Sequence, residues 1–129
     1  MKLETKMGGR WLDQGKLWRL CGEAGDLFYE ALRVYQHSAA SLRGQLAEAQ
    51  QQQDWPELRR LLHRLKGSLP YLASEPLCQR LIAVTLAAQH EDDLRLDCHW
   101  PGLQLGLTAL EQEIGQALSG QASTASSPH

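Results

Sequence analysis

Residues 54–72 read DWPELRRLLHRLKGSLPYL, and they predict an amphipathic helix with one buried face. At about 100° of rotation per residue, the apolar positions fall within roughly 60° of one direction. These positions are Leu58, Leu61, Leu62, Leu65, Leu69 and Leu72. Asp54 suits the N-cap, Pro56 the first turn, and Glu57 the capping-box position. The segment therefore predicts a helix that packs a leucine stripe against other elements.

The histidine of this segment lies away from the leucine stripe. With Leu58 placed at 0°, Lys66, His63 and Gly67 fall at about 80°, 140° and 180°. Residues three and four positions apart lie on the same side of a helix. The His63 imidazole is therefore expected to have the Lys66 ammonium beside it and the bare backbone of Gly67 one turn away. A solvated surface histidine without a function is the alternative explanation of this position.

The rest of the chain predicts further helices over residues 12–21, 26–50, 75–89 and 103–118. Residues 50–53 either extend the second of these or form the turn after it. Residues 90–102 contain four acids, His90, His99 and Pro101, and they are expected to form a loop. The apolar positions expected to face inward are Leu27, Ala31, Tyr35, Leu42, Leu46, Ala49, Leu77, Leu81, Val84, Ala88, Leu103, Leu107, Leu110 and Ile114.

Helices of this length with short connections bury their stripes most simply by packing side by side. The expected fold is therefore all-α, an antiparallel up-down four-helix bundle with an additional short N-terminal helix. A chain of 129 residues is long enough for one such core. We expect a flexible leader over residues 1–10, the bundle over 11–118 and a disordered tail over 119–129.

Composition narrows the classes of function. A net charge of −2 gives no reason to expect nucleic acid as a partner. No apolar run approaches the roughly 18 residues of a membrane span, and the N-terminus does not resemble a signal peptide. The cysteines Cys21, Cys78 and Cys98 fit reduced thiols, two of them core fillers. Zinc is not expected, because Cys98-His99 has no second pair at ligand spacing.

Residues 63–68, HRLKGS, resemble the His-x-x-Lys-Gly-Ser signature of histidine-containing phosphotransfer (HPt) domains, the four-helix relay modules of multistep two-component signalling. The resemblance covers about residues 12–118. Within it, GDLFYEAL (25–32), QDWPEL (53–58) and EPLCQRL (75–81) are similar to helix-start segments of the family. After the motif, many HPt domains have small residues and then Leu-Gly-Ala, whereas this chain has LPYLAS.

Pro70 is the main departure from the family pattern. It removes a backbone donor and clashes with the carbonyl four residues back, at Lys66. A kink or early unwinding is therefore expected one to two turns beyond His63. Such a kink would reshape the surface that docks a partner, but it would leave His63, Lys66 and Gly67 in place.

The resemblance implies specific roles for the motif. His63 would be phosphorylated by a receiver-domain phosphoaspartate and would pass the group to another aspartate. Lys66 would stabilise the phosphoryl group, and Gly67 would give the receiver access. Partner docking is expected to involve Arg59, Arg60, Arg64 and Pro70, although a solvated helix face explains each arginine equally well.

The resemblance also implies the partners of a bacterial phosphoprotein in a two-component system. These are a response-regulator receiver domain and a hybrid histidine kinase, with no nucleic acid and no membrane insertion. No cofactor is expected, since Mg²⁺ belongs to the receiver, and the chain lacks a Gly-rich phosphate loop for its own ATP-dependent kinase activity. We expect a cytoplasmic monomer, either independent or the cytoplasmic C-terminal part of a membrane-bound hybrid kinase.

Two other classes of function are alternatives to phosphotransfer for this chain. One is a non-catalytic docking or adaptor module, which Pro70 favours and which predicts that His63→Gln leaves partner binding intact. The other is a bundle that binds a small ligand or metal. It would need inward-facing ligand side chains at paired i, i+3 or i+4 spacing, and the stripes show none.

Overall fold

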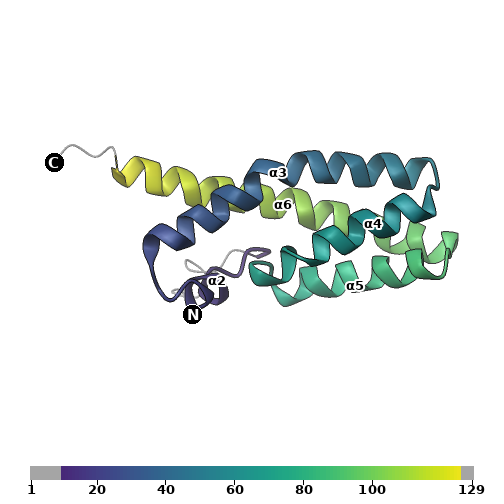
Figure 1. Ribbon diagram of the computed structural model, residues 1–129, viewed down its shortest axis with the longest axis horizontal. Helices are drawn as coiled ribbons and strands as arrows, with labels where there is room; N and C mark the ends of the chain where they lie inside the picture. Colours follow the sequence, from purple (N-terminus) through teal and green to yellow (C-terminus); the bar gives the residue numbers. More distant parts are fainter. Residues whose placement is uncertain (1–9, 126–129) are drawn as a thin grey trace.

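The computed structural model describes residues 10–125 of the chain, with side chains described to residue 120. Its elements, in chain order, are α2 (Gln14–Leu20), α3 (Gly25–Gln51), α4 (Trp55–Lys66), the 3₁₀ turn η1 (Leu69–Tyr71), α5 (Glu75–Gln89) and α6 (Asp93–Ala125). Consecutive long helices run in opposite directions, and α2 lies at one end of them (Figure 1).

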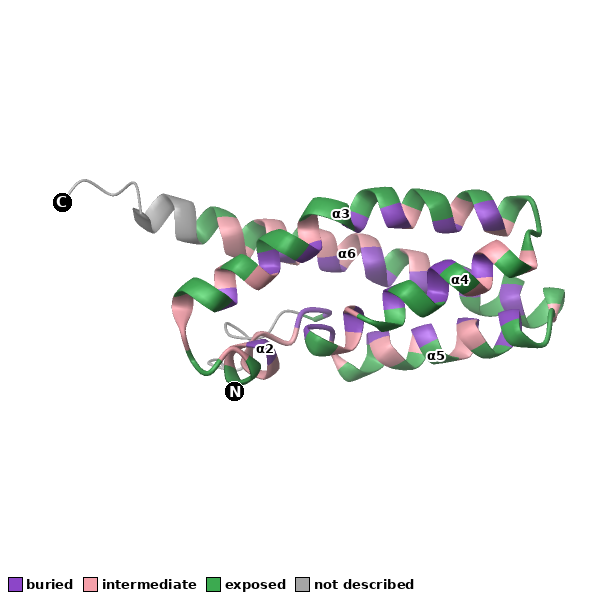
Figure 2. Cartoon of the chain, in the orientation of Figure 1, coloured by how far each residue is buried: buried purple, intermediate pink, exposed green. Residues whose placement is uncertain are grey.

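The four long helices form a closed bundle. Helix α3 contacts α4 and α6, and α5 contacts the same two helices on the other side. Where side chains are described, the buried residues of the long helices lie mainly on the faces turned toward the other helices (Figure 2). The expected fold, an up-down four-helix bundle with a short additional helix, is therefore confirmed.

The core is built mainly of leucine. The whole stripe of residues 54–72 is buried as expected: Leu58, Leu61, Leu62, Leu65, Leu69 and Leu72. The expected inward positions of α5, which are Leu77, Leu81, Val84 and Ala88, are buried too. Burying these side chains away from water is the principal favourable contribution to folding.

The expected inward face is wrong at the start of α3. Leu27 is exposed, and Phe28 and Leu32 are buried in its place. The ring of Trp18 packs edge-on against Phe28, at 5.6 Å between ring centroids. Because α2 folds back onto the first turns of α3, the larger aromatic ring turns inward and Leu27 faces solvent. Because Leu27 and Phe28 are adjacent and both apolar, the sequence alone did not decide which of them faces the core.

The expected loop over residues 90–102 is also wrong beyond residue 92. The turn is short: Glu91 has a left-handed backbone with φ of 51°, and the Asp92 carboxylate accepts from the Arg95 amide at 3.1 Å. That is the N-cap hydrogen bond of α6. His99 therefore lies on a helix rather than in a loop.

Pro101 lies inside α6 and does not end it. Leu96, Trp100 and Leu103 are all buried at helical spacing on either side of the proline, and this packing outweighs the lost backbone hydrogen bond. The Gly102 carbonyl accepts a hydrogen bond from Arg80 of α5 at 2.8 Å. At its other end the helix continues to Ala125, so residues 119–125 of the expected disordered tail are helical. Residues 126–129 and 1–9 of the tail and leader lie outside the described residues.

An N-terminal segment ties the bundle together at the end where α4 finishes. The Glu113 carboxylate of α6 accepts from the amides of Trp11 and Leu12 at 3.0 and 2.9 Å. Leu12 forms an isolated antiparallel bridge with Ala73. The Asp13 amide donates to the Leu72 carbonyl at 2.8 Å. The chain between α4 and α5 is therefore held by backbone hydrogen bonds although it is not α-helical.

Stability at alkaline pH is expected to depend on Tyr35. Burial raises the pKa of this phenol well above its ordinary value of about 10, and the nearby Glu111 carboxylate adds to the effect. The unfolded chain releases the proton first, so the free energy of unfolding is intact below pH 10 and falls above it, by roughly 1.4 kcal/mol per pH unit.

The measurement is urea unfolding between pH 8 and 11, for the natural chain and for Tyr35→Phe. The variant is expected to lose stability less steeply above pH 10, because it has no phenol to ionise. Identical slopes for the two proteins would contradict the assignment to Tyr35.

Candidate functional site

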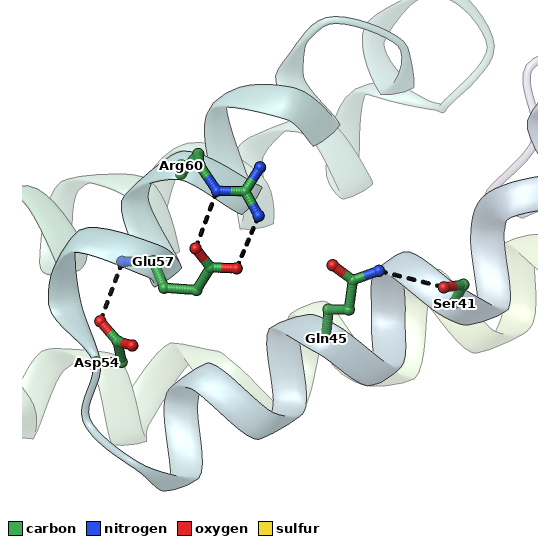
Figure 3. A network of polar contacts seen from close by, with 5 residues as sticks. All are labelled: Ser41, Gln45, Asp54, Glu57 and Arg60. Carbon is green, nitrogen blue, oxygen red and sulfur yellow. Dashed lines mark hydrogen bonds and ion pairs between the residues drawn. The ribbon is translucent and has the colours of Figure 1, made fainter.

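Helix α4 begins at a well-defined cap. The Asp54 carboxylate accepts from the Glu57 amide at 3.2 Å, as the N-cap expectation requires. The Glu57 carboxylate does not return to the Asp54 amide; it binds the Arg60 guanidinium at 2.9 and 2.7 Å (Figure 3). Only half of the capping box therefore forms, and this hydrogen bond from Arg60 lowers the pKa of Glu57.

His63 lies on the exposed face of α4, close to the end of the helix. Leu62 and Leu65 beside it are buried, whereas His63 and Lys66 are exposed. Within residues 10–120, the His63 imidazole has no hydrogen-bond or ion-pair partner. Both ring nitrogens are therefore accessible to a partner molecule. The position on the helix agrees with the one expected from the leucine stripe.

The helix unwinds directly after Lys66, earlier than Pro70 was expected to break it. The Gly67 amide bonds both the His63 and Arg64 carbonyls, at 3.2 and 3.1 Å, and the Ser68 amide bonds the Leu65 carbonyl at 3.1 Å. Such i to i+3 bonds tighten the last turn of a helix. Pro70 then lies in the first turn of η1. The helix does unwind, but the expected position was wrong: the unwinding starts less than one turn beyond His63 rather than one to two turns beyond it.

Gly67 is exposed, and its backbone does not require glycine. Its φ and ψ are −72° and −17°, which any residue adopts. A Cβ atom added here would lie 3.3 Å from the Arg64 carbonyl oxygen, a close but local contact. The backbone conformation therefore does not explain why residue 67 is glycine. The effect of the glycine is to leave bare backbone four residues from His63.

The cations around His63 do not form one cluster. The Arg59 guanidinium bonds the Glu91 carboxylate at 3.1 Å and the Ala88 carbonyl at 3.3 Å, toward α5. The Arg60 guanidinium is neutralised by Glu57. Among the residues whose side chains are described, Arg64 and Lys66 have no ion-pair partner. Of the expected docking arginines, only Arg64 presents an uncompensated charge.

Comparison with known proteins decides the family. The family model of the Hpt domain matches residues 30–120, which contain α4 and most of the bundle. The chain belongs to the Hpt domain family. No curated protein and no solved structure matches it significantly.

The HPt domain also has a groove that the sequence did not indicate. It lies between α4 and α5, has a volume of about 390 Å³, and is lined by Lys66, Pro70, Ile82 and Leu86 among others. Lys16 of α2 also lines the groove and donates to the Ala73 carbonyl at 2.7 Å. No sequence signal pointed to Lys16, because it is distant from the motif in the chain.

The other histidines and the cysteines are spread over several elements of this HPt domain, although His90 and His99 line one pocket together with Asp92 and Arg95. His37 is exposed on α3, and Cys98 and His99 are exposed on α6. Cys21 and Cys78 are partly buried against the core. Within the described part of the chain, no three His, Cys, Asp or Glu side chains are placed to hold a metal ion. None of the described helices has the length and apolar character needed to cross a membrane.

Proposed function

We propose that His63 of this HPt domain receives a phosphoryl group from a receiver-domain aspartate and passes it to another. The observation that supports this most is the exposed, unpartnered imidazole of the His-x-x-Lys-Gly-Ser motif, inside the segment that matches the family. The buried stripe of α4 holds this imidazole on a rigid helix. Rigid positioning and charge compensation are what phosphoryl transfer chiefly requires of a protein.

The proposed step is a substitution at phosphorus. A ring nitrogen of His63 forms a bond to phosphorus, the bond between phosphorus and the aspartyl oxygen breaks, and the receiver recovers a free carboxylate. The Lys66 ammonium balances charge on a phosphoryl oxygen as a point charge. The bare backbone at Gly67 leaves room for the loops of the receiver. Reversal of the same step on a second receiver completes the relay.

The proposal extends to the setting of the domain. Receiver domains of response regulators are the partners of this family, and we propose a hybrid histidine kinase as the source of the phosphoryl group. Mg²⁺ would be held by the receiver, and the HPt domain would need no cofactor. We further propose a cytoplasmic setting in a bacterial relay. The domain would act as a monomer, because its inward apolar stripes are used within one bundle.

The test is transfer of labelled phosphate from a panel of phosphorylated receiver domains to the chain. Label that is labile in acid and stable in base is expected, because a phosphorus–nitrogen bond has this stability. A receiver that binds the chain but transfers nothing would contradict the proposal. It would favour the second candidate, a docking module without chemistry, for which the unwinding directly after Lys66 is the supporting observation.

Replacement of Lys66 by glutamine is expected to slow transfer about tenfold, which corresponds to about 1.4 kcal/mol of lost stabilisation in the transition state. The reason is the loss of the exposed charge one turn from His63. The measurement is the rate of label transfer from a receiver that phosphorylates the natural chain.

Arg64→Gln provides the matched control for this variant. Arg64 is also exposed and unpaired among the described side chains, but it points about 160° away from Lys66 around α4. A small effect is expected. Equal effects of the two substitutions would show that net charge matters rather than the position of Lys66.

A further inference from the structure

The two sides of His63 around α4 differ in chemistry. On the α3 side, Ser41 and Gln45 of α3 bond each other, and Glu57 bonds Arg60 (Figure 3). The exposed aliphatic residue Val34 lies two turns from Ser41 along α3. On the α5 side lies the groove of about 390 Å³ described above. A partner that approaches His63 therefore meets hydrogen-bonded polar groups on one side and an open groove on the other.

His63 lies nearer to the α5 side of α4 than to its α3 side. Arg59 reaches the end of α5, which fixes the direction of α5 as seen from α4. Lys66 lies two turns further along in nearly the same direction and lines the groove. His63 does not itself line the groove, but it is rotated only about 60° from Lys66 and about 40° from Arg59 around α4. The reactive group and the groove thus share one face of the domain.

The groove combines exposed apolar surface with positive charge. Ile82 and Leu86 are one turn apart on α5, and they are 49% and 51% exposed. Lys66 and Lys16 lie at its margins, and Glu75 is the carboxylate among its lining residues. Exposed aliphatic residues grouped beside a functional group are typical of a protein interface.

We propose that the groove between α4 and α5 docks the receiver domain, with an apolar surface of the receiver covering Ile82 and Leu86. This inference rests on the proposed function. The occupant follows from continuity and charge: the groove is continuous with Lys66 of the phosphorylation motif, and the phosphoaspartate site of a receiver is anionic. Docking on this side brings the anionic site to Lys66 and His63 together.

Ile82→Glu and Leu86→Glu test the proposal, since each places a negative charge in the centre of the apolar surface without altering the buried core. Val34→Glu is the matched control, because Val34 is a 61% exposed aliphatic residue on α3. Two rates are measured for each chain: labelling from the receiver that phosphorylates the natural chain, and labelling by the small donor phosphoramidate. In the second reaction the phosphoryl group moves from the donor nitrogen to a ring nitrogen of His63, and ammonia leaves.

Both groove variants are expected to accept phosphate from the receiver at least about tenfold more slowly, with labelling by phosphoramidate unchanged. Val34→Glu is expected to match the natural chain in both reactions. Unchanged transfer from the receiver in the groove variants would overturn the docking surface and leave the proposed function intact. If the natural chain formed a dimer and the groove variants did not, with transfer unchanged, the groove would instead bind a second copy of this chain. Failure of the natural chain to take phosphate from either donor would overturn both proposals.

Discussion

Replacement of His63 by glutamine is expected to abolish phosphoryl acceptance and to leave the fold unchanged. The glutamine amide offers no nucleophilic nitrogen, because its lone pair is delocalised into the carbonyl group. His63 is exposed and its imidazole has no partner among the described side chains, so stability should change by no more than about 0.5 kcal/mol. The measurements are label uptake from a phosphorylated receiver and urea unfolding of the same sample.

His37→Gln is the matched control. His37 is also an exposed histidine on a long helix, but it lies on α3 and has no lysine three residues on. Its replacement is expected to leave label uptake unchanged. If label uptake persisted in the His63 variant and disappeared in the His37 variant, the proposal would be wrong, because the reactive histidine would lie on α3.

Replacement of Leu65 by alanine is expected to give the largest loss of stability, about 2–5 kcal/mol. Leu65 is 1% exposed and points into the centre of the bundle. It adjoins a small space of about 10 Å³ that is also lined by Tyr35, Leu42 and Leu107, so three helices meet at this side chain. Truncation enlarges that space and removes the contacts that the Leu65 side chain makes with the residues around it. Urea unfolding, followed by the helical circular dichroism signal, measures the difference.

Leu94→Ala provides the control for the leucine series. Leu94 is 82% exposed at the start of α6, so its truncation is expected to change stability by less than about 0.5 kcal/mol. Similar losses in the two variants would mean that Leu65 is not the central core contact described above. The comparison uses the same substitution in both places and varies only burial.

The sequence was most informative about α4. The leucine positions of residues 54–72 repeat at helical spacing, so their burial and the exposure of His63 followed from rotation about one helix axis. The cap at Asp54 also followed, because it depends on residues within one turn, whereas the unwinding was expected from Pro70 and begins earlier, at Gly67. The same local rules failed at Pro101, which was expected to lie in a loop and lies inside α6.

The family and the candidate nucleophile were predictable because they reside in six consecutive residues. The proposed docking groove was not, because, apart from Pro70, its lining residues beyond Lys66 belong to α2 and α5 and are distant in sequence from the motif. Likewise, the pairing of Arg59 with Glu91 and of Glu113 with the Trp11 amide joins segments far apart in the chain. Periodicity along one helix carries no information on such contacts.

By itself the sequence determined an all-helical bundle and an exposed His63 beside Lys66 and Gly67, since short-range geometry fixes which side of a helix each residue occupies. Only the tertiary structure decided that Phe28 rather than Leu27 faces inward, that α6 continues through Pro101, and that α5 opens a groove beside the motif. These outcomes depend on which surfaces of different helices meet. The free energy of burying those surfaces can outweigh the local preferences of a proline or a single side chain.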